Sequence, residues 1–113
     1  MVDVAKMLEN VNVAILASDA DFKVIYQNEK CRQLFKEVLG RENYIGAHLI
    51  ECHKPETTEK VEGYFKEYKE KKRPLDYYVM NEPDHKTTVV NVPFYDGQEF
   101  AGVVEFIFES SLV

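Results

Sequence analysis

Three segments with the composition of β-strands follow one another in the last third of the chain. They span residues 75–80, 86–95 and 99–108, and turn signals at 81–84 and at Asp96-Gly97 separate them. Alternation along the last segment assigns one face to Phe100, Gly102, Val104, Phe106 and Phe108. It assigns the other face to Ala101, Val103, Glu105, Ile107 and Glu109. Both faces are largely apolar, which predicts a sheet that is covered on both sides.

The beginning of the chain predicts a helix followed by a hairpin. Val4, Met7 and Leu8 share one side of a short amphipathic helix over Val2–Asn10. Two β-rich runs follow, Val11–Ser18 and Phe22–Gln27, and the turn signal Asp19–Asp21 separates them.

The middle of the chain is predicted to be helical. Asn28 can cap a helix whose apolar stripe is formed by Cys31, Leu34 and Phe35, and Gly40 can end it. Ile45–Cys52 is predicted to form one or two irregular helical turns.

Pro55 suits the first position of the next helix, which Pro74 ends. Its apolar positions are Val61, Tyr64, Phe65 and Tyr68, spaced by three and four residues as in a helix with one face on a sheet.

The order of these elements predicts an α+β fold: a five-stranded antiparallel sheet with helices packed on one face, preceded by an N-terminal helix. We expect a single domain over residues 1–113, with the helix at 1–10 and the core at 11–109. The second sheet face then needs the N-terminal helix or a second subunit as its cover.

Composition limits the compartment and the partners. The net charge of −6 disfavours nucleic acid, and no apolar run is long enough to span a membrane. No signal peptide is visible, so we expect a cytoplasmic protein. The two cysteines lack a C-x-x-C spacing, which predicts free, buried thiols. The basic residues at the end of the second long helix are interpreted as a solvated helix end: Lys66, Lys69, Lys71, Lys72 and Arg73.

The run from Tyr44 to Pro55 is the one place with possible chemistry, because it carries His48, Cys52 and His53. His53 either ligates a metal or bonds to the backbone before Pro55. His48 is five residues away, which misses the spacing of a zinc pair, and is expected at the surface. Cys52 is either a reactive thiol or a buried structural one. No catalytic constellation is present, so we expect no enzyme.

The element order resembles the PAS domain over almost the whole chain. The segment "ILASDADFKVIYQNEKCRQLF" is similar to a PAS first hairpin and helix, with Asn28 as the cap. The segment "TTVVNVPFYDGQEFAGVVEFIFE" is similar to the last hairpin. The resemblance implies a sensory or interaction module that binds a small ligand or a partner and dimerises through the N-terminal helix and the outer sheet face.

Cys52-His53-Lys54-Pro55 also resembles the Cys-His-Pro-Pro type motif of a prokaryotic PAS subgroup, with Lys54 replacing a proline. A related His-Pro element occurs in haem-binding PAS gas sensors. That likeness implies an alternative function as a haem-based gas or redox sensor, with His53 as axial ligand of the iron and Met80 as a second ligand.

The strand aromatics are expected to pack in the core, or some of them to line a ligand pocket. Tyr78 and Phe106 are the candidates for such a lining. Asn91, between Val90 and Val92, is expected to point inward and bond to a ligand or a water. The identity of any ligand stays open.

Overall fold

The computed structural model of the protein describes residues 3–53, 57–81 and 83–109. Its helices are α1 (Val4–Glu9), α2 (Glu29–Leu39), the 3-10 helix η1 (Leu49–Cys52) and α3 (Thr58–Lys69). Its strands are β1 (Ala14–Asp19), β2 (Val24–Gln27), β3 (Asp76–Asn81), β4 (Lys86–Asp96) and β5 (Glu99–Phe108).

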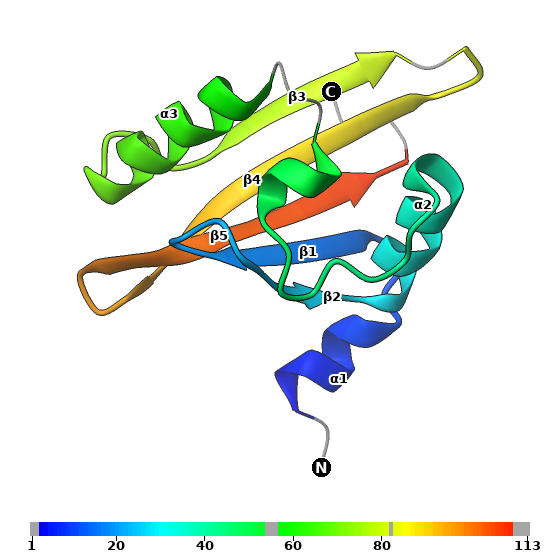
Figure 1. Ribbon diagram of the computed structural model, residues 1–113, viewed down its shortest axis with the longest axis horizontal. Helices are drawn as coiled ribbons and strands as arrows, with labels where there is room; N and C mark the ends of the chain where they lie inside the picture. Colours follow the sequence, from blue (N-terminus) through cyan, green and yellow to red (C-terminus); the bar gives the residue numbers. More distant parts are fainter. Residues whose placement is uncertain (1–2, 54–56, 82, 110–113) are drawn as a thin grey trace.

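The five strands form one antiparallel sheet in the order β2-β1-β5-β4-β3, so the last strand of the chain lies in the middle (Figure 1). The first hairpin therefore pairs with the last three strands through β1 and β5. The predicted α+β fold is confirmed.

Helices α2 and α3 and the turn η1 lie on one face of this sheet (Figure 1), which we call the inner face. Cys31 and Phe35 of α2 and Phe65 and Tyr68 of α3 belong to the same buried cluster as the inner-face strand residues. The strand members of that cluster are Ala14, Leu16, Val24, Val89, Val103 and Ile107. The apolar spacing of the two helices is thus explained by burial against the sheet.

Asn28 joins α1, β1 and α2. The side chain is fully buried; Oδ1 accepts from the N–H groups of Cys31 and Ile15, and Nδ2 donates to the carbonyls of Leu8 and Val13. The predicted cap of α2 is present. Strand β1 begins at Ala14 and not at the predicted Val11, and this amide binds the carbonyl of Val13, the residue just before the strand.

The first hairpin also differs from its prediction at Phe22. This residue has a left-handed φ of 67° and lies in the turn, where the Asp19 carboxylate accepts from the N–H groups of Asp21 and Lys23. The Phe22 ring consequently stacks on Phe65 of α3, with centroids 4.3 Å apart. The predicted start of α3 at Pro55 lies outside the described residues, and the described helix begins at Thr58.

Strict alternation along β5 is wrong at Phe100. Phe94 pairs with Gly102 but Tyr95 pairs with Phe100, so Ala101 forms a β-bulge. The bulge turns Phe100 to the inner face, where its ring contacts Phe65 with centroids 5.5 Å apart. Gly102 follows directly, and a Cβ there would lie 2.0 Å from the Ser18 carbonyl oxygen.

Helix α1 lies beside β2 at one edge of the sheet (Figure 1). It is tied down by the bond from Asn28 to the Leu8 carbonyl and by the ion pair of Glu9 with Arg32. Its apolar side chains Val4 and Met7 are 68% and 60% exposed. Two of the three residues of the expected apolar stripe are therefore largely uncovered within the described part of this chain, whereas Leu8 is half-buried.

Candidate functional site

The turn η1 is built by His48, which stands before it. Nδ1 of His48 accepts from the N–H of Ile50 at 3.1 Å, and the Glu51 carboxylate accepts from the N–H of His48 at 3.3 Å. The two bonds form a capping box, and the His48 ring stacks on Phe22. His48 is exposed, as expected, but it also acts as a helix cap, which the sequence analysis did not foresee.

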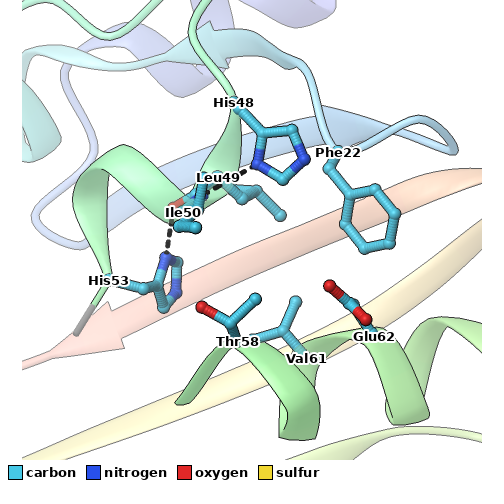
Figure 2. A pocket seen from close by; sticks show the side chains of 8 residues that line it. All are labelled: Phe22, His48, Leu49, Ile50, His53, Thr58, Val61 and Glu62. Atoms are coloured by element: carbon cyan, nitrogen blue, oxygen red, sulfur yellow. Dashed lines mark hydrogen bonds between the residues drawn. The ribbon is translucent and has the colours of Figure 1, made fainter. Parts of the chain in front are cut away.

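His53 ends this turn and points toward the sheet. Its Nδ1 lies 2.8 Å from the carbonyl oxygen of Leu49 (Figure 2), and a carbonyl only accepts, so Nδ1 carries a proton. Its Nε2 lies 3.6 Å from Oε2 of Glu105 on β5. A lone pair facing a carboxylate would be repelled, so the second ring nitrogen is protonated too, and the two side chains form an ion pair.

Burial by itself lowers the pKa of His53, because a charged imidazole loses hydration. Its interactions with Cys52 and the Glu105 carboxylate oppose this and raise the pKa to about 11. The side chains of His53 and Glu105 are only 17% and 12% exposed, so water screens their attraction weakly. His53 is therefore a cation at neutral pH.

Glu105 belongs to a polar row across the inner face. Strand register places Asp76, Asn91 and Glu105 directly beside one another. The Tyr68 hydroxyl of α3 donates to Asp76, and Nδ2 of Asn91 donates to the same carboxylate at 3.2 Å. Burial and the bond to Asp76 raise the pKa of Tyr68. Two buried carboxylates thus connect the sheet to η1 and α3.

The predicted site residues are divided between the two faces. Asn91 points inward, and its described partner is Asp76. Tyr78 and Met80 follow Asp76 at alternate positions of β3 and share the inner face, 39% and 40% exposed. Burial, then Glu105 and Asp76, raise the pKa of Tyr78.

Phe106 is the exception. It pairs with Ile15 and Val90 on the outer face, because alternation turns it away from its inward neighbour Glu105. Phe106 and His53 therefore lie on opposite faces of the sheet, and a role of Phe106 in lining a ligand pocket stays a prediction.

Glu105 is not among the predicted site residues, although its sequence context carries a signal. It is a carboxylate between the apolar residues Val103 and Ile107 on one strand face. A buried charge needs a partner, and the nearby motif supplies His53.

The two cysteines have different surroundings. Cys31 of α2 is fully buried, and burial raises the pKa of its thiol to about 12. Cys52 is half-buried, its Sγ 3.3 Å from the Leu49 carbonyl and 3.5 Å from Nδ1 of His53. Both are free thiols, and the expected burial applies fully only to Cys31.

A small cavity of about 10 Å³ lies between η1 and α3. Figure 2 shows His53, Thr58 and Phe22 around it. Oγ1 of Thr58 is buried and has no hydrogen-bond partner among the described residues. This volume suffices for about one water, whereas ligand pockets measure about 300–1,000 Å³.

The residues present do not fit a haem. The cavity beside His53 is far too small for the macrocycle, and the ring nitrogen that would ligate iron faces Glu105. Within the described residues there is also no group of three or more His, Cys, Asp or Glu side chains that could hold a metal ion.

An antiparallel sheet of this strand order, with helices packed on one face (Figure 1), defines a small α+β domain. The chain belongs to the PAS domain family, whose sequence pattern it matches over residues 4–110. The match concerns the family as a whole, and membership of the Cys-His-Pro-Pro subgroup stays a prediction. No curated protein matches the chain.

Three solved structures share the fold. A PAS domain from Colwellia psychrerythraea has a TM-score of 0.68 and 20% identity, with 93% of this chain and 92% of that chain covered. A sensory box sensor histidine kinase from Vibrio cholerae has a TM-score of 0.64 and 11% identity, with 97% of this chain and 90% of that chain covered. The Aer2 receptor from Vibrio cholerae, described as a dual PAS-haem oxygen sensor, has a TM-score of 0.63 and 12% identity. The match covers 88% of this chain and 96% of that chain.

None of the described helices has the length and apolar character needed to cross a membrane.

Proposed function

We propose that this chain is a PAS sensory module, not an enzyme, that acts as one unit over residues 1–113 in the cytoplasm. It responds to a small ligand or a partner at the His53–Glu105 pair and transmits the response through β5 to a homodimer interface. The supporting observation is that this pair ties η1 directly to the central strand of the sheet.

Strand β5 can carry such a signal because alternate residues face opposite sides. Glu105 faces His53, whereas its neighbours Val104 and Phe106 face outward. A ligand that takes His53 away from Glu105 leaves a carboxylate unpaired in a buried position, which is costly. The strand then has to adjust, and its outer side chains move with it. This is a shift between two packings of one domain.

The outer face offers a surface for a second copy. Its half-buried side chains on β4 and β5 form an apolar patch: Val90, Val92, Phe94, Val104, Phe106 and Phe108. The exposed Val4 and Met7 of α1 provide further apolar surface. Contiguous exposed apolar surface marks interaction sites in soluble domains.

Charge substitution on this surface tests the assembly. We expect Val4→Glu and Phe106→Glu to convert a dimer into monomers in light scattering. Val38→Glu on α2 is the matched control, because Val38 is 69% exposed and Val4 is 68% exposed. A dimer that survives both outer-face substitutions, or a monomeric wild type, would refute this interface.

The proposed binding of a ligand at the His53–Glu105 pair is tested separately. Protein purified from its native source is examined by native mass spectrometry, as wild type and as Glu105→Gln. We expect a bound mass in the wild type that is lost or weakened in the variant. Equal ligand occupancy in the wild type and in Glu105→Gln would show that the His53–Glu105 pair does not take part in ligand binding.

A further inference from the structure

A second concave surface lies away from His53, between the α3–β3 connection and the β4–β5 hairpin, at the left of Figure 1. It is an open groove of about 440 Å³, a volume typical of ligand sites. Lys71, Lys72 and Arg73 supply its cations. Pro74, Pro93 and Tyr95 supply its apolar part. We call it the basic groove.

The charge at the basic groove is opposite in sign to the net charge of the whole chain. Residues 66–73 contain five Lys or Arg and two Glu, whereas the whole chain has a net charge of −6. Attraction to the α3 C-terminus explains cations within the last turn, such as Lys66 and Lys69. It does not explain Lys71, Lys72 and Arg73, because the helix cap is already Glu70.

Several of these side chains are held in place. Lys71 has a left-handed φ of 58°, and its Nζ lies 5.7 Å from the centroid of the Tyr95 ring. The same Nζ donates to Oε1 of Gln98 at 2.5 Å, so within the described residues its charge meets a neutral amide and a ring. Arg73 lies over the Tyr64 ring and pairs with Glu67, and Lys72 pairs with Glu70 at 2.8 Å.

The sheet is narrower beside this groove. The β3–β4 ladder ends at the pair Asp76–Asn91, while the β4–β5 ladder continues to Asp96–Glu99. Beyond Asn91, strand β4 therefore pairs only with β5 among the described strands. Pro93 lies in this stretch, where the absence of an N–H costs no ladder bond to β3. Pro93 and Tyr95 of this stretch of β4 line the basic groove.

We propose that the basic groove docks an acidic, extended segment of a partner protein. A carboxylate of this segment pairs with Lys71, which contacts a neutral amide and a ring, and an apolar side chain beside it rests on Pro74, Pro93 and Tyr95. A short segment experiences mainly the local positive field, since charges beyond about 8 Å are screened at physiological salt. A long polyphosphate chain would also meet the acidic remainder of the surface, which favours a peptide over nucleic acid.

The test uses a short fluorescein-labelled peptide of glutamates interspersed with leucines, its lysine counterpart and a labelled single-stranded oligonucleotide. Binding to the full chain is followed by fluorescence anisotropy at low and at about 0.5 M salt. The groove variant is Lys71→Glu/Lys72→Glu, because both side chains line the basic groove. The control is Lys6→Glu/Lys36→Glu on α1 and α2, which changes the net charge equally. Circular dichroism checks folding, and Lys71→Gln/Lys72→Gln replaces the groove variant if it does not fold.

We expect the acidic peptide alone to bind, with salt weakening the complex. The groove variant should lose about tenfold or more in affinity, because reversal adds repulsion to the lost attraction, and the control should stay within about twofold. Absence of acidic-peptide binding, equal loss in both variants, or tighter binding of the oligonucleotide would each overturn the proposal.

Discussion

The imidazole of His53 faces the carboxylate of Glu105 across the boundary between η1 and β5, with Nε2 3.6 Å from Oε2. The distance is that of an ion pair and not of a short hydrogen bond. Because the Leu49 carbonyl already fixes Nδ1, the pair holds the ring in one orientation. It fastens the irregular part of the chain to the centre of the sheet.

Removing the carboxylate should lower the pKa of His53. In Glu105→Gln we expect this pKa to fall from about 11, because burial is then opposed by the interactions with Cys52 without those of the carboxylate. Titration of the imidazole resonances by NMR measures this. An unchanged His53 titration would show that Glu105 does not hold the proton.

The same pair makes stability depend on pH. The folded pKa of His53 is above its unfolded value, so its contribution is complete below pH 6.5 and declines as pH rises toward about 11. Urea unfolding of wild type and Glu105→Gln should differ by about 1–3 kcal/mol near pH 6. The difference should shrink at pH 9–10, and a constant difference would contradict the ion pair.

Hemin should not bind through His53. The cavity beside the ring is about 10 Å³, and Nε2 is engaged with Glu105. We expect hemin to give the same Soret band with wild type and His53→Ala. A Soret band that shifts specifically in His53→Ala would contradict this expectation and restore the haem-sensor function.

Substitution of Asn28 should strongly reduce the stability of the fold. Asn28→Ala removes a helix cap and leaves the buried partners of four hydrogen bonds to find others. We expect a loss of about 2–4 kcal/mol in the free energy of unfolding, measured with urea. Asn43→Ala is the control, because among the described residues its Oδ1 accepts a single, exposed bond from Ile45, and the loss of stability should stay near or below about 1 kcal/mol. Equal losses of stability in Asn28→Ala and Asn43→Ala would show that Asn28 does not join α1, β1 and α2.

Two glycines should respond in opposite directions. Gly102→Ala places a Cβ 2.0 Å from the Ser18 carbonyl oxygen and should destabilise by about 3 kcal/mol or more. Gly63→Ala, in α3 with open space around it, should stabilise by about 0.5–1 kcal/mol. Thermal unfolding of both variants measures the contrast. A Gly102→Ala protein as stable as wild type would mean that β5 does not approach Ser18 so closely.

The local elements could be predicted because each has a local cause. Asn28 and Gly40 bound α2 through bonds within a few residues of chain, and Asp96-Gly97 forms the last turn. The fold class followed from their order and from the PAS resemblance. The alternation that places Glu105 and Phe106 on opposite faces also belongs to the strand itself.

Amino-acid order alone thus determined the elements, their sequence and the presence of a histidine motif beside a helix. The bulge at Ala101, which turns Phe100 inward, depends on how β4 and β5 align, and no local pattern encodes it. The partner of His53 is likewise 52 residues away on β5. Only closure of the sheet through β1 and β5 brings that carboxylate close to η1. The attraction between two charges depends on their distance in space and not on their separation along the chain.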